Sequence, residues 1–504
     1  MNRLPNVCMM FVIAILSLPL FAQTDPGTQS TPSQDSVASL RQQLQQTQEQ
    51  LSRSELEIRE LRAMMEKMQR QVEALAGPSG KEGINIYPTE TETTAQAPAS
   101  APASDDWQML SAKVEEHQQV KVESASKFKL KLSGLVLFNA FNTAGSVDNI
   151  DVPEFAVPRS VAAPHGSSGA SIRQSIIGFT AIGPQLGGAH TSADLQMDFF
   201  GGMPSGYPQY ASGIARLRIA RMRFDWDKTS ITAGLDVPFF SPLSPTSYMS
   251  VGEPAFSASG NLWTWVPTVR IEQRQKIGAA QLKIEAGLID YATYSGYRVI
   301  SDRIPSPGES SQQPAYSLRL SVNKPSEDNP LAFGIGGIYV PQQYPGGRQV
   351  SGWGGTSDFR FPVTSHVEVS GEFFTGKGIN GFGGTTFGSI PQDFHYTYVT
   401  APVLASLFSI GGWSQLKLKL NTRNEINAAA GYGGFSSSHL RTASLNDSYL
   451  TNVPARNQTM FTNYIFRPRS NLLFSLEYRH LRTFTLSGPP ATADQVGAAA
   501  GFLF

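Results

Sequence analysis

The sequence has little of what several classes of protein depend on. Its 504 residues include a single cysteine, Cys8, which leaves no disulfide framework and no cysteine pair to hold a metal. The 40 basic residues are matched by 40 acidic ones, so there is no basic excess to displace counterions from phosphates, and no nucleic-acid partner is expected. Charged residues make up only 16% while aromatic residues reach 10%, which argues against a long disordered chain. The one apolar run lies at the N-terminus, which argues against a helical membrane protein.

Residues 1–22 have the pattern of a secretory signal peptide. Arg3 supplies the positive start, Phe11 to Leu20 is the apolar stretch, and Ala22 is a small residue at the expected cleavage site. The alternative is a membrane-anchor helix, which the short apolar run disfavours. Because Cys8 lies in this segment, the mature chain is expected to lack cysteine and thiolate chemistry.

A self-associating helix is predicted for residues 36–77. Apolar residues recur at alternating spacings of three and four, and ten of the twelve positions of this seam, from Val37 to Leu75, are apolar. Such a seam over nearly six heptads is typical of an α-helical coiled coil, with a helix packed on its own chain as the alternative. Gly77 and Pro78 end the helix, and residues 78–126 are expected to form a linker.

From Lys127 the hydrophobic period becomes two. Leu416, Leu418 and Leu420, for example, alternate with Lys417 and Lys419. This alternation is typical of a strand with one face in water and the other in an apolar environment. The pattern predicts sixteen strands, over residues 127–142, 171–183, 189–200, 214–226, 229–238, 262–275, 280–291, 315–323, 331–341, 349–361, 364–377, 404–420, 424–436, 457–467, 471–484 and 494–504.

The connections between these strands alternate between long and short. The segments 143–170 and 239–261 are long, whereas Asp227-Lys228 is a tight turn. Short turns at one end and long loops at the other are the layout of an outer-membrane barrel, which must close because lipid offers no hydrogen bonds. The terminal Phe504 looks like the C-terminal signature of bacterial outer-membrane barrels. Residues 127–504 are therefore predicted to form an all-β transmembrane barrel of about 16 antiparallel strands in a bacterial outer membrane, with the N-terminal α-helical coiled coil in the periplasm.

Basic residues gather at positions that the alternation turns towards the lumen. Residues 127–504 hold 30 basic and 24 acidic residues. Guanidinium groups suit carboxylates and phosphates, so a lumen attractive to anions is predicted. The alternative is an ion-paired wall without solute preference, because several glutamates, such as Glu272 and Glu372, also face inward. The predicted pore-lining, anion-binding residues are Lys129, Lys131, Arg173, Arg216, Arg218, Arg221, Arg223, Arg270, Arg274, Arg319, Lys417 and Lys419.

Four of these arginines cannot share one face of a regular strand. Arg216 and Arg218 have one parity, and Arg221 and Arg223 have the other. An arginine facing lipid at mid-depth would cost about 2–4 kcal/mol. The sequence therefore predicts a β-bulge between Ile219 and Arg221, or an interfacial position, with all four side chains near water.

The third long loop, residues 239–261, could narrow the lumen. If it folds into the barrel, Glu253 and the nearby Asp236 would lie opposite the arginines and create a transverse field at a constriction. The alternative is an ordinary external loop.

No catalytic residue, metal site or cofactor is predicted, and the chain is not expected to be an enzyme. Gly376 to Gly381 matches a dinucleotide fingerprint and Gly371 to Lys377 nearly matches a P-loop, but both need a following helix, and residues 382–386 read as loop. The seven histidines are scattered without metal-site spacing.

The order of signal peptide, heptad helix, linker and sixteen-strand barrel resembles the DcaP-like trimeric outer-membrane channels. Short local similarities accompany this order in the segments Leu132–Val136, Arg173–Ser175, Gly178-Phe179, Arg216–Arg218 and Ala233–Asp236. The resemblance implies a homotrimer and diffusive uptake of small, often anionic, solutes. The chain departs from the family in the many Gly and Ala residues of the strands at 331–341 and 424–436 and in its long sixth loop.

The leading hypothesis is a porin for passive diffusion of small hydrophilic solutes, biased towards anions such as carboxylates. Its expected partners are other copies of itself, outer-membrane lipids and those solutes. A second hypothesis is a structural or adhesive anchor whose barrel is occluded. A third, a barrel-embedded enzyme acting on lipids, has no nucleophile motif to support it.

Overall fold

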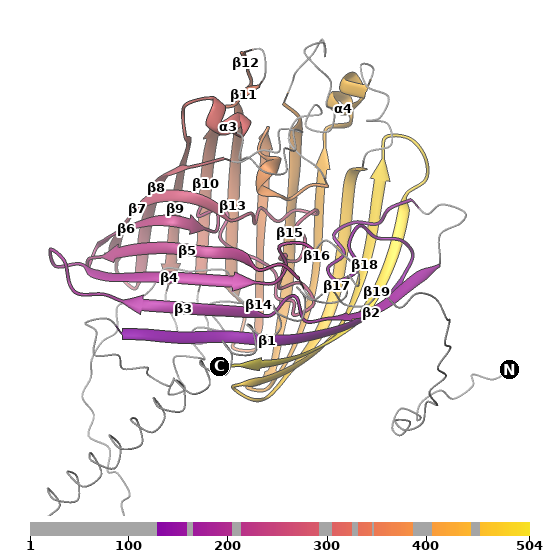
Figure 1. Ribbon diagram of the computed structural model, residues 1–504, viewed down its shortest axis with the longest axis horizontal. Helices are drawn as coiled ribbons and strands as arrows, with labels where there is room; N and C mark the ends of the chain where they lie inside the picture. The colour runs from indigo at the N-terminus through magenta and orange to yellow at the C-terminus, as the bar shows by residue number, and fades with distance from the viewer. Residues whose placement is uncertain are drawn as a thin grey trace, which may run out of the picture. The chain divides into compact units, whose positions relative to one another are not determined.

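The computed structural model describes residues 129–158, 165–203, 213–291, 305–324, 331–344, 347–386, 406–444 and 454–504 (Figure 1). The predicted signal peptide (1–22), coiled coil (36–77) and linker (78–126) lie outside these residues. Among the described residues, no helix is both long and apolar enough to cross a membrane.

The described strands form one closed antiparallel barrel (Figure 1). The barrel has sixteen strand positions around its circumference, which we call staves. The barrel closes because β1 (Lys129–Ala144) pairs with the last strand, with Leu135 opposite Leu503 and Asn142 opposite Val496. The second stave consists of two segments that both pair with β1, namely β2 (Gly166–Ser171) and β3 (Ile176–Ile182). The other staves are β4 (His190–Asp198), β5 (Arg216–Asp225), β6 (Thr229–Asp236), β7 (Val266–Ile277), β8 (Ala280–Ile289), β9 (Ala315–Lys324), β10 (Leu331–Val340), β13 (Gly352–Pro362), β14 (Val367–Lys377), β15 (Phe408–Asn421), β16 (Asn424–Phe435), β17 (Pro454–Arg469), β18 (Leu472–Thr485) and β19 (Ala491–Leu503).

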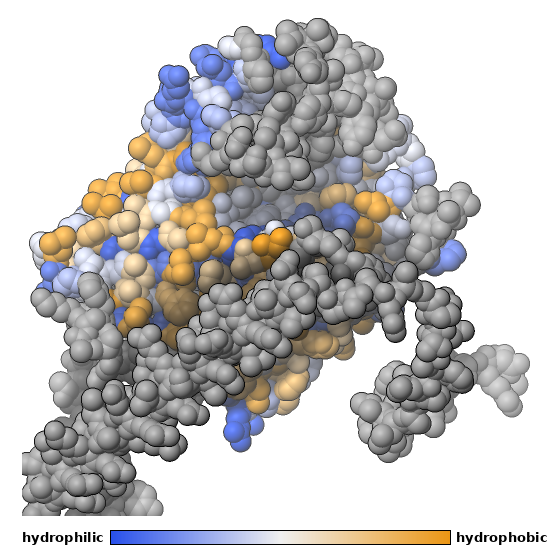
Figure 2. Space-filling view, in the orientation of Figure 1, coloured by the Kyte–Doolittle hydropathy of each residue, from blue (hydrophilic) through white to orange (hydrophobic). Residues whose placement is uncertain are grey.

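The two faces of each strand meet different environments, as the period of two predicts. On β7, Val269 and Ile271 are half exposed on the outer face, whereas Arg270 and Glu272 are buried on the inner face. Figure 2 shows the outcome as hydrophobic residues spread across the strands, with hydrophilic residues gathered towards the end that carries the long connections. A sheet of this kind satisfies every spanning backbone group internally, which is the condition for crossing lipid. The predicted transmembrane-type barrel of sixteen strands is thereby confirmed as a fold.

The predicted strand 171–183 is wrong in one respect, because the second stave is interrupted at residues 172–175. The Ser175 backbone N–H donates to the Ile172 carbonyl in a tight turn, and the Leu137 backbone N–H of β1 donates to the Ser175 hydroxyl instead of to a strand carbonyl, at 3.0 Å. The side chain thus replaces a missing ladder bond. The interruption turns Arg173 and Gln174 into the lumen, where both are buried.

Short elements lie in the connections at the long-loop end of the barrel (Figure 1). They are the helix α3 (Pro307–Ser310), the hairpin β11 (Gln343–Tyr344) and β12 (Arg348–Gln349), the 3-10 turn η1 (Asn380–Phe382) and the helix α4 (Ser437–Ser444). The sequence pattern predicts none of them, because each is shorter than the window over which periodicity can be recognised.

Candidate functional site: the lumen wall and its inward loop

The segment between β6 and β7, residues 237–265, lies inside the barrel. Almost all of its residues from Phe239 to Leu262 are buried, including Phe239, Phe240 and Tyr248. A loop on the outside of the barrel would be largely exposed to water. The inward alternative for the third long loop is therefore the one that the structure adopts. We call this segment the inward loop.

The inward loop begins by crossing the inner faces of β8 to β14. The Phe240 ring packs edge-to-face on Phe382 at 5.1 Å, within an apolar cluster that also contains Ile289 and Ile338. The Glu372 carboxylate of β14 then holds the chain from two sides. It accepts from the Ser241 hydroxyl at 2.8 Å and from the Leu243 backbone N–H at 2.6 Å.

The loop continues along the inner faces of β15 to β18. The Gln415 side-chain oxygen of β15 accepts from the Thr246 backbone N–H at 2.6 Å, and the Asn463 side chain of β17 donates to the Thr246 carbonyl at 2.9 Å. On β18, the Glu477 carboxylate accepts from the Ser247 hydroxyl at 2.6 Å. Polar side chains of three strands therefore bind the loop backbone or its hydroxyls, much as a strand partner would.

The loop then reaches β1 and the interruption of the second stave. The Asn139 side chain donates to the Tyr248 carbonyl at 2.8 Å. The Gln174 side-chain oxygen accepts from the backbone N–H groups of Val251 and Gly252, at 2.7 and 2.9 Å. The loop thus contacts the wall from β8 round to β1 and to Gln174, and it forms a belt against this part of the inner wall.

Glycines on the inner wall make room for this belt. A Cβ at Gly431 of β16 would clash with the Ser259 carbonyl oxygen of the loop, and one at Gly336 of β10 would lie 2.8 Å from the Phe240 carbonyl oxygen. Gly260, at φ +112°, lies directly against the Gly412 backbone. The glycines in the strands predicted at 331–341 and 424–436, which depart from the family pattern, thus permit close backbone approach.

Charged residues of β4 to β13 and of the inward loop form two ion-paired clusters, which together we call the network. One cluster contains Arg216, Arg218, Asp198 and Glu253, and the other extends from Asp194 on β4 to Asp358 on β13. Arg221 contacts Asp194 at 3.1 Å and Asp236 at 2.9 Å, and Arg216 contacts Asp198 at 2.7 Å. Further along the wall, Arg319 joins Asp358 at 2.7 Å and Glu285 at 3.1 Å. The remaining contacts of the network involve Arg218, Arg223, Arg270, Arg274, Lys283, Asp225, Glu253 and Glu272.

The network is balanced in charge. It contains eight cations and eight carboxylates, each within 4.0 Å of at least one opposite charge. Buried charges persist only when they are paired in this way. The pairing agrees with the alternative expectation of an ion-paired wall, and it weakens the argument that the wall attracts anions by excess charge.

The strand β5 contains an irregularity, as the four arginines require. Ile219 pairs with Gln196 and Leu217 pairs with Met197, so Arg218 has no partner residue on β4. The bulge thus lies at Arg218 and not between Ile219 and Arg221. All four arginines reach acidic partners of the network, and Leu217 and Met222 face outward in their place.

The two acids predicted at a constriction lie against these arginines. Glu253 of the inward loop is 3.8 Å from Arg216, and Asp236 at the end of β6 contacts Arg221 and, at 3.4 Å, Arg270. Whether this cluster restricts the passage of solutes stays a prediction.

Other predicted pore residues lie outside the network. Arg173 pairs with Asp151 of the β1–β2 connection at 2.8 Å. Lys129 and Lys131 are near the start of β1, and Lys417 and Lys419 are on the inner side of β15, where Lys417 interacts electrostatically with Glu425. The structure therefore does not unite the twelve predicted residues in one site.

Sequence reasoning missed the residues that hold the inward loop. Gln174, Gln415 and Asn463 carry no charge and match no motif, so nothing in the sequence singles them out. Glu372 was predicted only as an inward-facing acid.

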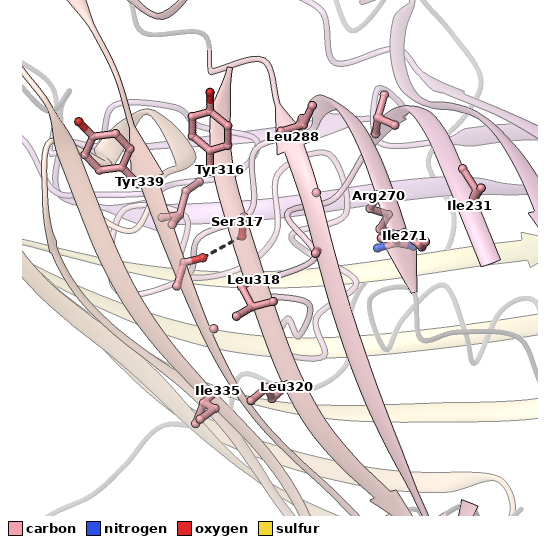
Figure 3. Close-up of a pocket in the computed structure, with 16 residues that line it drawn as sticks. Ile231, Arg270, Ile271, Leu288, Tyr316, Ser317, Leu318, Leu320, Ile335 and Tyr339 are labelled. Carbon is pink, nitrogen blue, oxygen red and sulfur yellow. Dashed lines mark hydrogen bonds between the residues drawn. The ribbon is translucent and has the colours of Figure 1, made fainter. Parts of the chain in front are cut away.

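A concavity on the outer face of the barrel is a separate feature. It has a volume of about 900 Å³ and lies across β6 to β10, where Ala286 and Gly337 leave space between larger apolar residues such as Leu288 and Leu318. Figure 3 shows Tyr316 and Tyr339 side by side at one end of this groove. Its exposed apolar lining residues, such as Leu288 and Leu318, are on the outer face of the barrel, so the groove is not part of a route through the lumen.

The described residues contain no group of three or more His, Cys, Asp or Glu side chains that could hold a metal ion. No model of a known protein family matches the sequence, and no curated protein matches it either.

Solved structures nevertheless share the architecture. The outer membrane channel DcaP of Acinetobacter baumannii superposes with a TM-score of 0.59 at 17% sequence identity, over 76% of this chain and 99% of that one. Pseudomonas putida OprB reaches a TM-score of 0.46 at 10% identity, over 81% of this chain and all of the other. The anion-selective porin of Comamonas acidovorans reaches 0.44 at 12% identity, over 74% and 100%. The superposition on the A. baumannii channel confirms the fold expected from the resemblance to DcaP-like channels.

Proposed function

We propose that this chain is an outer-membrane channel for passive diffusion of small hydrophilic solutes. One observation carries the proposal: the closed barrel is apolar outside, while charged and polar side chains occupy much of its interior. A barrel that served only as an anchor would not need a network of sixteen ionised groups, because each buried charge costs desolvation energy. The fold shared with the A. baumannii channel supports the same proposal.

Water access on the wall supports a specific route. The side chains of Asp194, Arg216, Arg221 and Glu253 are 18–28% exposed, whereas those of Arg319, Glu285 and Asp358 are only 2–3% exposed. A solute path is therefore proposed along β4 and β5, between the network and the inward loop. The bias towards anions such as carboxylates is a second proposal, supported by the excess of basic over acidic residues in 127–504 and by the guanidinium groups on this route.

The test is single-channel recording in a planar bilayer under a potassium chloride gradient. The expected result is steady conductance, with a reversal potential that indicates chloride preference. Arg216→Gln combined with Arg221→Gln should reduce that preference without abolishing conductance. Arg423→Gln in the β15–β16 turn is the matched control. Preference for potassium in the unmodified protein would overturn the anion proposal and leave the channel in place.

The occluded anchor is retained as the second candidate, because one observation favours it. The inward loop and apolar side chains such as Leu137, Ile465 and Leu473 pack together inside the barrel. Absence of conductance from correctly folded protein would favour the anchor over the channel. Assembly into trimers, which the resemblance implies, and a periplasmic coiled coil, which the heptad pattern predicts, are proposals that cross-linking of the full chain would test.

A further inference from the structure

Two arginines face outward from the barrel, unlike those of the network. Arg456 of β17 and Arg482 of β18 are exposed and occupy the outward parity of their strands. Among the described residues, neither guanidinium contacts an acid or a hydrogen-bond acceptor. The contrast with the paired arginines of the lumen requires a physical reason, because an outward arginine is costly unless it reaches water or an anion.

Both guanidinium groups stack on one aromatic ring. The Arg456 Cζ lies 4.8 Å from the Phe484 ring centroid, and the Arg482 Cζ lies 4.9 Å from it. Arg456 is directly opposite Phe484 in the β17–β18 register, and Arg482 is opposite Gln458. The ring holds two positive charges close together although they repel each other. We call Arg456, Arg482 and Phe484 the outward arginine pair.

The single acid on the outer faces of β17 to β19, Asp494, is already bound. It accepts from the Tyr478 hydroxyl at 2.7 Å and contacts His480 Nδ1 at 2.8 Å. Among the described residues of these strands the pair therefore has no intramolecular counter-charge, and an external anion could supply one.

The depth of the pair identifies the kind of anion. Along the outer face of β18, Phe474, Leu476 and Tyr478 are followed by His480 and Arg482 towards the long-loop end. Arg482 is eight residues from Phe474, which corresponds to about 20 Å along the barrel axis for a strand tilted by roughly 40°. The apolar band of such barrels is about 25 Å tall, and its long loops face the outside of the cell. Arg482 thus lies at the level of the headgroups of the outer leaflet.

We propose that the outward arginine pair binds the phosphate groups of an acylated, phosphorylated glycolipid of the outer leaflet. Two adjacent guanidinium groups form charge-assisted, bidentate hydrogen bonds with phosphate, and Phe484 is placed to contact the apolar part of the same lipid. The proposal rests on placement in an outer membrane, as in the proposed function, but it does not require the barrel to conduct.

The experiment measures lipid binding to the full chain in detergent by native mass spectrometry. The probe is lipid A, the bisphosphorylated acylated glucosamine disaccharide, and its dephosphorylated form and sodium phosphate are the comparison ligands. The variant is Arg456→Gln with Arg482→Gln. The matched control is Arg423→Gln with Arg469→Gln, which removes one arginine from the β15–β16 turn and one from the end of β17 at the opposite rim.

The expected result is a loss of binding of roughly tenfold or more in the Arg456/Arg482 variant, with little change in the control. Unmodified protein should bind lipid A more tightly than its dephosphorylated form. Equal binding of lipid A by the Arg456/Arg482 variant and by the control variant would overturn the proposal. Binding of sodium phosphate as tight as that of lipid A would also overturn it, because the site would then serve a free anion. A change of oligomeric state in the Arg456/Arg482 variant would also overturn it and assign the pair to a contact between copies.

Folding is checked by retention of the heat-modifiable gel shift. Conductance of the Arg456/Arg482 variant, recorded in parallel, separates this proposal from the channel. A barrel that binds lipid A through the pair but never conducts would remove the proposed function alone.

Discussion

The charged side chains of the lumen wall are held in place more by ion pairs and hydrogen bonds than by steric packing. Arg319 is 3% exposed, and its guanidinium donates to Asp358 Oδ1 at 2.7 Å and Oδ2 at 2.9 Å and to Glu285 at 3.1 Å. Removing one member of such a group leaves an uncompensated buried charge, which costs about 3–5 kcal/mol. The geometry of each pair therefore depends on neighbours that leave enough space for it.

Gly334 of β10 provides this space, which gives a prediction at a single position. A Cβ there would clash with an Arg319 guanidinium nitrogen and with an Asp358 carboxylate oxygen. Gly334→Ala should lower the free energy of unfolding by about 1–3 kcal/mol, because the pair must shift. Urea unfolding in detergent, followed by tryptophan fluorescence, measures this change.

Gly355 of β13 is the matched control, because a Cβ there would meet nothing within 4 Å. Gly355→Ala should leave stability unchanged or raise it slightly, since alanine restricts the unfolded chain. Equal destabilisation by the two substitutions would show that backbone freedom, not the ion pair, determines the need for glycine at Gly334.

At the scale of elements, the sequence predicted the strands well and the loops poorly. All sixteen staves follow from the period of two, because one face of each meets lipid and the other meets polar groups. The periodicity cannot detect the interruption at 172–175, where a serine side chain takes the place of a ladder partner. The bulge in β5 was predictable because four arginines could not all face lipid, but its position at Arg218 depends on the pairing with β4.

The candidate site was only partly predictable for a related reason. Charged residues stand out in a sequence, so the arginines and Glu253 could be named. Their partners could not, because Asp194 and Asp198 of β4 and Lys283 of β8 meet opposite charges on neighbouring strands only through the register. The path of the inward loop depends on long-range hydrogen bonds to uncharged side chains, for which the sequence has no local signal.

The β1–β2 connection forms a small hairpin that should respond to pH. Asp148 accepts from the backbone N–H groups of Glu154 and Phe155, both at 3.0 Å, and Val147 bridges to Ala156. Burial raises the pKa of Asp148 from 3.8 to about 6, and burial together with the nearby Glu253 raises the pKa of Glu154 well above its usual range. Because the folded hairpin prefers the neutral acids, the stability that this adds is complete below pH 4 and is lost as the pH rises through 6.

Hydrogen-exchange protection factors of residues 146–157 should therefore be higher at pH 5 than at pH 7.5. Asp148→Asn keeps an oxygen acceptor but cannot ionise, so the part of the change centred near pH 6 should disappear. Glu154→Gln, made in parallel, isolates the contribution of the second acid. Protection that increases from pH 5 to pH 7.5 in the unmodified protein would contradict the prediction.

The described part of the barrel as a whole has an interior with two different sides. Along β4 to β13 the wall is a charged network, and its most exposed members are on β4 and β5. From β8 round to β1 the inward loop covers the wall, and residues such as Gln415 are 2% exposed beneath it. Along the described wall, water reaches the charged groups most readily on β4 and β5, so transport and reactivity should be confined to that part.

Cysteine accessibility tests this asymmetry, because Cys8 is the only cysteine in the chain and can be replaced by serine. In that background, Asp194→Cys should react rapidly with a water-soluble methanethiosulfonate reagent, and the reaction should reduce conductance. Gln415→Cys should react at least about tenfold more slowly, because the inward loop must open locally before the reagent can reach the thiol. Similar rates at the two positions would mean that the loop does not stay on the wall. An unreactive Asp194→Cys would instead place the aqueous path away from β4 and β5, and would leave the exposed charges there without a role in transport.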